Sequence, residues 1–450
     1  MIVMKFGGTS VADASAMKCV LEIVRQNCGK SLVVVLSACS GITDLLLKTA
    51  GFAGDKNEIS LNDTIIEIKQ RHITLINNLL ISEYFREEAL GKTEILVDKL
   101  KSLAEGVCLL GECTPRMYDS FASFGERLST AIFETACRES GIDSELIDAA
   151  DFMITDWNYQ AAKIRADLLQ LKADYLLKPL LNQGKTIITQ GFIGSDGEGH
   201  TTTLGRGGSD YSAALIGAAI NADEIQIWTD VPGVMSADPR IIPDAAAIPS
   251  LTFRAVGRLS YYGAKVLHPD TIKPAIDKNI PVRISDTFRP NLEGTIISND
   301  IGKGSCISHS IVLKQGLFFY SIIIPAAINP GSFTFSLTEA FINSESLIYS
   351  SVSGNEIKLL LSNTEIITEF KENFPAVSFF KRKADFAAII SSGAKVREIH
   401  DGLIKFLPVI HSFRPYFCEV NGEYSDIITC LEAGKGRECI IELHKIAAVN

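Results

Sequence analysis

The stretch IVMKFGGTS at residues 2–10 decides the fold of this chain. It starts as a short apolar run and ends at two glycines, which is the pattern of a buried strand that enters a tight turn. Apolar residues then recur at helical spacing between positions 17 and 24, which predicts a helix with one apolar face. Residues 31–36 return to a β-branched run, typical of a parallel strand covered on both faces. A strand–helix–strand unit of this kind predicts an α/β layered fold.

Composition places the chain among ordinary globular proteins. With 450 residues, 46% hydrophobic and 21% charged, it is expected to form two or three domains and is neither disordered nor low-complexity. A net charge of −10 argues against nucleic-acid binding as its main work, although a local phosphate pocket stays compatible with it. The ten cysteines are scattered without a CxxC pair, which predicts reduced thiols and no zinc site. Without a signal peptide or a membrane-spanning stretch, we expect a soluble, cytoplasmic protein with no membrane partner.

The pattern along the chain predicts a large α/β region followed by smaller modules. Residues 58–110 indicate long helices, and another helix is expected to begin near Thr114-Pro115 and to carry Glu126. The composition changes near residues 297–310, which we interpret as a linker. Beyond it, short strands alternate with helices in two similar passes, which predicts a pair of small α+β modules. The predicted domains are therefore 1–296, a linker at 297–310, and a region with two modules at 311–450.

Two glycine-rich segments are candidate anion sites. In the first, Gly7 and Gly8 follow a strand and precede a helix, so the backbone can approach a ligand closely while Lys5 adds a positive charge. It is not a Walker A loop, and an ordinary strand-to-helix turn is the alternative. In the second, glycines flank Arg206 and a Ser209-Asp210 pair just before a helix. A solvated loop explains these glycines but gives no reason for the arginine and the aspartate.

Together, several motifs make the chain resemble the aspartokinase family over roughly residues 2–296. They occur in the order and at the spacing of that family: KFGGTSV (5–11), GITD (41–44), FGERLS (124–129), TTTLGRGGSDY (201–211), WTDVPG (228–233), ADPR (237–240) and GAKVLHP (263–269). The layout is similar to the monofunctional, lysine-sensitive type. The resemblance implies a three-layer amino-acid kinase sandwich with a mostly parallel sheet, followed by tandem ACT modules of ferredoxin-like topology.

The resemblance also implies an activity. Aspartokinases transfer the γ-phosphoryl group of ATP to the side-chain carboxylate of L-aspartate, giving 4-phospho-L-aspartate and ADP, the first step toward lysine or diaminopimelate, threonine and methionine. Because the nucleophile is already ionised at pH 7, catalysis must consist of positioning two anions and neutralising their charge. ATP and Mg²⁺ are the expected cofactors, with the ion held mainly by phosphates and water, so no metal site made by protein side chains is expected.

Residue roles follow from the matching motif positions. Lys5 and Asp210 are the expected catalytic residues, with Lys5 bridging the transferred phosphoryl group and Asp210 holding Lys5. Arg206 is expected to bind the α-carboxylate of aspartate and Glu126 its α-ammonium group. The further residues expected at the substrate are Ser37, Thr43 and Ser209. Those expected at the nucleotide, besides Lys5, are Gly7, Gly8, Ser10, Thr229, Asp230, Met235, Arg240 and Lys265.

Two positions depart from the family pattern. Met235 stands where the lysine-sensitive type has a tyrosine near the nucleotide, so a hydroxyl group is lost there. The stretch Ser350–Asn355 corresponds to the family's effector site but lacks the carboxylate that would pair with a lysine ammonium group. Lysine is thus an expected effector by resemblance alone, and a homodimer or higher homo-oligomer is expected to form through the ACT modules.

Two other functions were weighed against this one. Another amino-acid kinase, acting for example on acetylglutamate or UMP, is the first; an acetylated substrate has no ammonium group and would not require Glu126. A catalytically inactive, ACT-containing amino-acid sensor is the second. The presence together of Lys5, Glu126, Arg206 and Asp210 argues against it.

Overall fold

The computed structural model describes residues 1–264, 266–299, 309–342, 344, 346–391, 405–421 and 426–447. The chain forms two compact units. Met1–Val234 and Leu267–Asn299 make up the first unit, and Met235–Val266 and Asp300–Asn450 make up the second.

A mostly parallel sheet forms the centre of the first unit. Strand β1 lies in its middle, and all neighbouring strands from β3 to β9 run parallel, while β10 is antiparallel to β9. The strands follow one another across the sheet in the order β3 (Ser144–Leu146), β4 (Thr186–Gln190), β2 (Leu32–Leu36), β1 (Ile2–Phe6), β7 (Glu224–Thr229), β9 (Val282–Asp286) and β10 (Thr295–Ser298). The strands β2 and β4 are buried along their whole length because helices cover both faces of the sheet.

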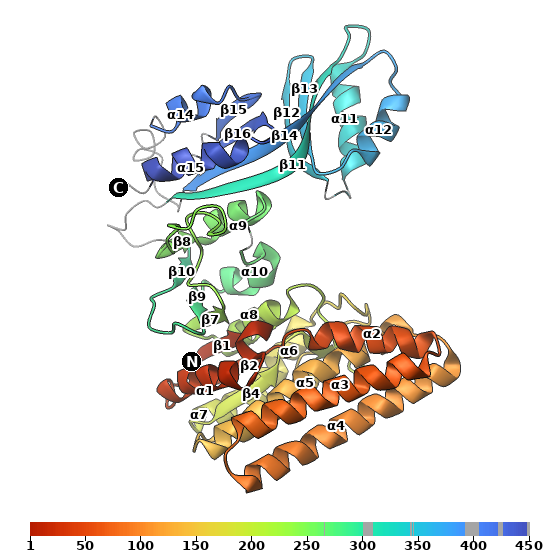
Figure 1. Cartoon of the computed structure of the whole chain (residues 1–450), viewed down its shortest axis with the longest axis vertical. Helices are drawn as coiled ribbons and strands as arrows, with labels where there is room; N and C mark the ends of the chain where they lie inside the picture. The colour runs from red at the N-terminus through yellow and green to blue at the C-terminus, as the bar shows by residue number, and fades with distance from the viewer. Residues whose placement is uncertain are drawn as a thin grey trace. The chain divides into compact units, whose positions relative to one another are not determined.

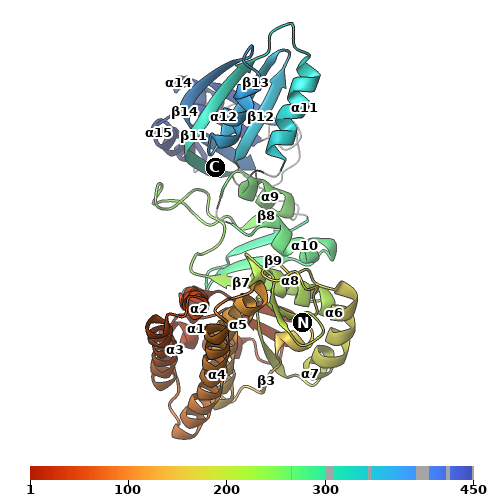
Figure 2. The same cartoon turned by 90° about the vertical axis from the view of Figure 1, so that its right-hand side faces the viewer.

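Helices cover the two faces of this sheet, which gives the three layers (Figures 1 and 2). One face is covered by the helices α1 (Ala14–Gln26), α2 (Ile42–Gly54), α3 (Glu58–Leu79), α4 (Glu83–Leu110) and α5 (Pro115–Glu139), which share one hydrophobic core with β1 and β2. The other face is covered by α6 (Ala166–Lys172), α7 (Lys178–Asn182) and α8 (Gly208–Ile220), with α10 (Pro269–Asp277) packed against α8. The predicted start of α5 is confirmed, since Thr114 is its N-cap and accepts a hydrogen bond from the backbone N–H of Met117.

A short hairpin, which the composition alone did not predict, leads into α8. Strands β5 (Ile193–Ser195) and β6 (Thr201–Thr203) pair antiparallel within the Gly/Ser/Thr-rich segment. The buried carboxylate of Asp119 on α5 holds β6 in place, because it accepts hydrogen bonds from both the backbone N–H and the hydroxyl of Thr203. Gly205 and Gly207, both with positive φ, then turn the chain into α8.

The second unit contains an antiparallel sheet with helices packed on it. Its strands follow one another in the order β12 (Leu347–Ser353), β13 (Glu356–Leu361), β11 (His309–Ile323), β14 (Ser378–Ser391), β16 (Asp426–Glu432) and β15 (Phe417–Asn421). The helices of this unit are α9 (Phe253–Tyr261), α11 (Pro330–Phe341), α12 (Glu365–Glu372), α14 (Leu407–Ser412) and α15 (Gly436–Ala447), and β8 (Ser250–Thr252) precedes α9.

Two α+β modules share the long strands β11 and β14. The core of one module contains α11, α12 and the second part of β11, whereas the other contains α14, α15 and the first part of β11. A register shift between Lys314 and Leu317 separates the two parts of β11. The predicted fold class is therefore confirmed: a three-layer sandwich with a mostly parallel sheet, followed by the α+β modules expected of an ACT pair.

The predicted domain boundaries stay a prediction. Most of the expected linker at 297–310 lies outside the described residues, since only 297–299 and 309–310 are described. Residues Met235–Val266 belong to the second compact unit, although they precede the last strands of the parallel sheet in sequence. Among the described residues, no helix has both the length and the apolar character needed to cross a membrane.

Candidate active site

A cavity of about 580 Å³ lies where the parallel strands β1, β2, β4 and β7 end. The last residues of β1, β2 and β4 lie side by side in register, since Leu36 pairs with both Phe6 and Gln190, and Phe6 pairs with Trp228, the penultimate residue of β7. The segments that follow these strands therefore meet at one edge of the sheet, where ligands bind in open α/β folds. The N-terminal end of α8 completes the wall.

Lys5 and Asp210 form an ion pair inside this cavity. The ammonium nitrogen of Lys5 lies 2.6 Å from Oδ1 of Asp210, and the two side chains are only 11% and 22% exposed. Lys5 is the penultimate residue of β1, whereas Asp210 lies in the first turn of α8, so the fold brings together two residues far apart in sequence. The pair fixes a positive charge at the point where an anionic ligand would enter.

Glycines let the backbone come close to this charge. A Cβ atom at Gly7 would lie 3.6 Å from Nζ of Lys5, and one at Gly8 would lie 3.1 Å from the carbonyl oxygen of Ala38. On the other side, a Cβ at Gly208 would come within 2.7 Å of the ring of Phe192, which excludes any side chain there without a rearrangement. The free N–H groups at the start of α8 add partial positive charge.

Glu126 is a buried carboxylate with an unused oxygen. It lies on α5 with 3% of its surface exposed, and its Oε1 accepts a hydrogen bond of 3.2 Å from the backbone N–H of Ala38. Its Oε2 has no hydrogen-bond partner among the described residues. Burial raises the pKa of this carboxyl group to about 8. Because an unpaired buried carboxylate is costly, the ionised form of this group is favoured only when a positively charged or hydrogen-donating ligand pairs with the free oxygen.

The loop Ser37–Gly41, which joins β2 to α2, forms another wall of the cavity, and we call it the substrate loop. Its first carbonyl, that of Ser37, accepts a hydrogen bond of 2.7 Å from the hydroxyl of Ser129 on α5. Its last residue, Gly41, has a φ of 77° and caps α2. Arg206 also lines the cavity and is exposed, with no ion-pair or hydrogen-bond partner in the described part of the chain. Its guanidinium group is thus available for a carboxylate ligand.

The structure brings most of the predicted site residues together. Those lining the cavity are Lys5, Gly7, Gly8, Ser37, Thr43, Glu126, Arg206, Ser209, Asp210 and Thr229.

Four of the predicted nucleotide residues that the structure describes do not line this cavity. Ser10 is fully buried, and its hydroxyl forms a 2.7 Å hydrogen bond with that of Thr287. Asp230 is exposed and accepts a hydrogen bond from Thr229. Met235 and Arg240 belong to the second unit, whereas the cavity is lined by the first unit alone. Lys265 lies outside the described residues.

Some residues of the site were missed from the sequence. Phe192 follows β4 and lines the cavity with a φ of 68°, and its position after a buried strand was the available signal. Arg71 lies on α3 and donates a 2.6 Å hydrogen bond to the carbonyl oxygen of Ser40 in the substrate loop. Nothing in the local sequence of α3 indicated that contact, because it depends on how α3 packs against α2.

The family follows from comparison with known proteins. The model of the amino acid kinase family matches residues 1–286, which is more than half of the chain, and the chain therefore belongs to this family.

Individual relatives are aspartokinases. The chain is 39% identical over 298 residues to the lysine-sensitive aspartokinase 3 of Escherichia coli, and the match covers 66% of this chain and 64% of that protein. It is 36% identical over 326 residues to a chloroplastic aspartokinase of Arabidopsis thaliana, covering 71% and 56% of the two chains. The chain thus spans a little under two thirds of the length of the curated relatives it matches.

Solved structures extend the likeness to the whole chain. The structure of E. coli aspartokinase III with lysine and aspartate is similar at a TM-score of 0.79 and 27% identity, covering 99% of each chain. The aspartate kinase of Clostridium acetobutylicum, at 23% identity, has the same fold, with a TM-score of 0.80 over 100% of each chain.

Proposed function

We propose that this protein is an aspartate kinase, which transfers the γ-phosphoryl group of ATP to the side-chain carboxylate of L-aspartate. The observation that carries the proposal is the unpartnered Oε2 of Glu126 in a cavity that also holds the free guanidinium group of Arg206. A carboxylate and a guanidinium that line the same cavity are complementary to the α-ammonium and α-carboxylate groups of an amino acid. The likeness to aspartokinases supports aspartate as that amino acid.

The proposed catalysis is charge neutralisation with positioning. Lys5, oriented by Asp210, would lie between the side-chain carboxylate of aspartate and the transferred phosphoryl group and reduce their repulsion. No general base is needed, because the attacking carboxylate is already ionised at neutral pH. The backbone N–H groups of Gly8, and of Ser209 and Asp210 in the first turn of α8, would hold phosphate oxygens.

The residues of the cavity fit ATP as the phosphoryl donor. Gly7 and Gly8 line the cavity beside Lys5 and carry no side chains, so a phosphate chain can approach the backbone there. We propose that Thr229 and Asp230 contact the nucleotide, and that Ser10 supports the phosphate-binding turn from inside through its hydrogen bond with Thr287. Met235, Arg240 and Lys265 are proposed as nucleotide residues by resemblance to the family. Mg²⁺ would be held by the phosphates and water and would neutralise part of their charge.

The two alternative functions leave some of these cavity residues without a role. A kinase for an N-acetylated amino acid or for UMP offers Glu126 no ammonium group, so its Oε2 would stay without a charged partner in the complex. A sensor without activity needs neither Lys5 nor Asp210, yet the two form an ion pair inside the cavity.

A hydroxamate assay tests the proposal directly. The purified protein, given ATP, Mg²⁺, aspartate and hydroxylamine, is expected to form aspartyl hydroxamate, whereas glutamate and N-acetylglutamate should give none. Lys5→Ala should lower kcat by roughly 10²–10³-fold because a charge that stabilises the transition state is lost. Circular dichroism should show an unchanged fold in that variant. Absence of product from the wild-type protein, or a fully active Lys5→Ala variant, would contradict the proposal.

We further propose that the two modules carry a homo-oligomer interface and an amino-acid effector site. Large apolar side chains are exposed on and next to α11, namely Phe335 at 64% and Ile342 at 73%, and β12 is an edge strand. Lysine is the first effector to test because the E. coli structure holds it. Titration calorimetry with lysine, threonine and methionine, and sedimentation of the protein with and without each, would decide both points.

The free thiols of the nine described cysteines support a reducing, cytoplasmic location.

A further inference from the structure

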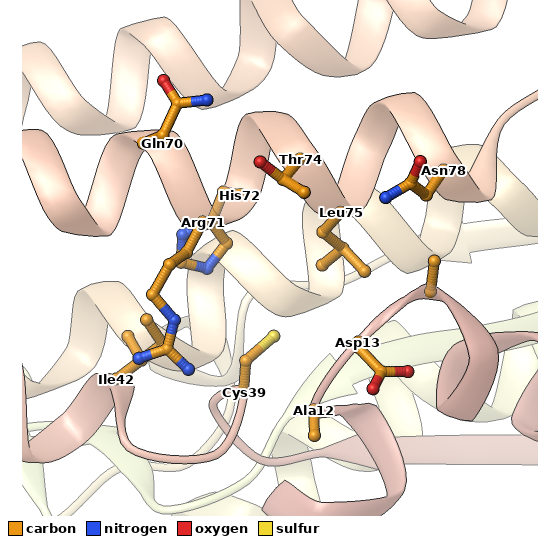
Figure 3. Close-up of a pocket in the computed structure, with 11 residues that line it drawn as sticks. Ala12, Asp13, Cys39, Ile42, Gln70, Arg71, His72, Thr74, Leu75 and Asn78 are labelled. Carbon is orange, nitrogen blue, oxygen red and sulfur yellow. The ribbon is translucent and has the colours of Figure 1, made fainter.

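A second cavity lies behind the substrate loop. It has a volume of about 270 Å³ and lies between the start of α1, the substrate loop and α3 (Figure 3). Cys39 lines both this cavity and the candidate active site, so the loop separates the two. Because one side of the loop faces a cavity, packing supports it less there than a filled core would.

Arg71 spans the edge of this rear cavity to reach the loop. Figure 3 shows its side chain extending from α3 toward Ile42 and Cys39. Its Nη2 donates a 2.6 Å hydrogen bond to the carbonyl oxygen of Ser40, and a Cβ atom at Gly41 would lie 3.6 Å from its Nη1. The guanidinium group therefore contacts the loop exactly where Gly41 must adopt a positive φ before α2 begins.

The front of the loop is held by a different helix. Glu126 and Ser129, both on α5, bind the backbone of Ala38 and Ser37. The loop is thus held at its start by α5 and at its end by α3. Loss of the second contact would leave Ser40 and Gly41 free to move toward the rear cavity, and with them Thr43 at the start of α2.

We propose that Arg71 is a positioning residue for the amino-acid substrate, acting through the substrate loop without touching the substrate. This inference rests on the proposed function and goes beyond it, because it assigns a role to the α3 helix outside the cavity. Lys5 is held by Asp210 on α8 and not by the substrate loop, so we expect nucleotide binding to change less than aspartate binding. Misplacement of a binding wall by about 1 Å is enough to weaken substrate positioning strongly.

Steady-state kinetics with Arg71→Met, which keeps the bulk of the side chain but donates no hydrogen bond, tests the proposal. The KM for aspartate should rise roughly tenfold, with kcat and the KM for MgATP changed by less than about threefold. Arg71→Lys keeps a donor and should recover part of the loss. Lys69→Met is the matched control, because Lys69 lies on the same helix but pairs with Glu94 on α4, 2.7 Å away.

Hydrogen–deuterium exchange gives a readout that does not depend on activity. The amides of Ile42 and Leu45 donate to Cys39 and Gly41, and Arg71→Met should accelerate their exchange while Lys69→Met should not. Unchanged exchange in Arg71→Met would overturn the proposal even if the wild-type protein fails to phosphorylate aspartate. The proposal would also be overturned if Arg71→Met raised the KM for aspartate and the KM for MgATP equally and high salt removed both increases. Such a result would indicate a general electrostatic effect.

Discussion

Glu126 combines burial with an acceptor oxygen that no described residue satisfies. Such a group is tolerated in a folded protein when a ligand completes it, or when the group stays protonated. The pKa of about 8 means that the free protein holds this carboxyl group largely in its protonated form at neutral pH. Binding of an ammonium group must therefore be coupled to loss of a proton from Glu126.

This coupling predicts the pH dependence of substrate capture. The value of kcat/KM for aspartate should rise about tenfold per pH unit between pH 6 and about 7.5 and level off above pH 8, because the ionised fraction of Glu126 follows that course. Glu126→Gln should give a low and nearly flat profile over the same range. The kcat/KM for MgATP at saturating aspartate serves as the control. A wild-type profile without any rise below pH 8 would remove Glu126 from the substrate site.

At the scale of elements, close contact between α5 and the substrate loop sets the width of the cavity. Gly125 precedes Glu126 on α5, and a Cβ at this position would come within 2.7 Å of the Cβ of Ala38. The helix can therefore lie against the loop, and the Ala38 amide can reach the Glu126 carboxylate, only because position 125 lacks a side chain.

Gly125→Ala should consequently separate stability from activity. Alanine favours the interior of a helix by about 1 kcal/mol over glycine, but the added methyl group would push the loop away from α5. We expect a change in Tm of only a few degrees together with a rise of roughly tenfold in the KM for aspartate. Gly106→Ala on α4, where a Cβ would meet nothing within 4 Å, is the control and should leave KM unchanged. Equal KM values for the two variants would show that the contact at Ala38 does not matter.

The elements that the sequence predicted best are those fixed by local signals. The strand before Gly7-Gly8 and the helix that starts at Thr114-Pro115 have strong periodicity and caps, and both occur as expected. The β5–β6 hairpin was missed because its threonines lie in a segment whose glycines indicate a loop. Its stability comes from distant partners, such as the 2.7 Å hydrogen bond between Thr155 and Thr202, which no local pattern reveals.

At the scale of the whole molecule, each unit contains a histidine with a lowered pKa; His72 is buried and His309 is partly buried. Burial lowers the pKa of His72 in the first unit and of His309 in the second to about 4. In the unfolded chain both histidines have the ordinary pKa of 6.5 and bind protons below that pH. In the folded chain they bind protons only near pH 4. Stability should therefore fall as the pH decreases from about 6.5 to about 4, by up to about 1.4 kcal/mol per pH unit for each histidine.

Urea unfolding at pH 7, 6 and 5 measures this effect for the first unit. Both tryptophans of the chain, Trp157 and Trp228, lie in that unit, so their fluorescence reports its unfolding. His72→Met should reduce the loss of stability between pH 7 and 5. His309→Met should leave the fluorescence-detected loss unchanged, because it acts in the other unit. The same pH dependence in all three proteins would show that His72 is not responsible.

Long-range organisation was the least predictable level. The resemblance of the motifs implied the sandwich and the modules, and ten predicted site residues line one cavity. The membership of Met235–Val266 in the second unit could not be predicted, because it depends on contacts such as those of Ser236 with His444 and with the backbone of Ile311. Sequence patterns report which face of an element is apolar but not which distant element covers it.

The shared strands β11 and β14 also constrain how this architecture can be changed by deletion. The module that contains α11 and α12 (the inner module) is inserted in sequence within the module that contains α14 and α15 (the outer module). Lys314 pairs with Phe386 and Leu317 with Ala384, so the chain passes into the inner module and returns from it at neighbouring positions of β11 and β14. A single deletion of that interval could remove the inner module and leave the outer one with continuous strands. The outer module has no such excisable interval, because its strands flank the inner one on both sides in the sequence. Over evolutionary time, the two modules are thus unequally exposed to loss by recombination.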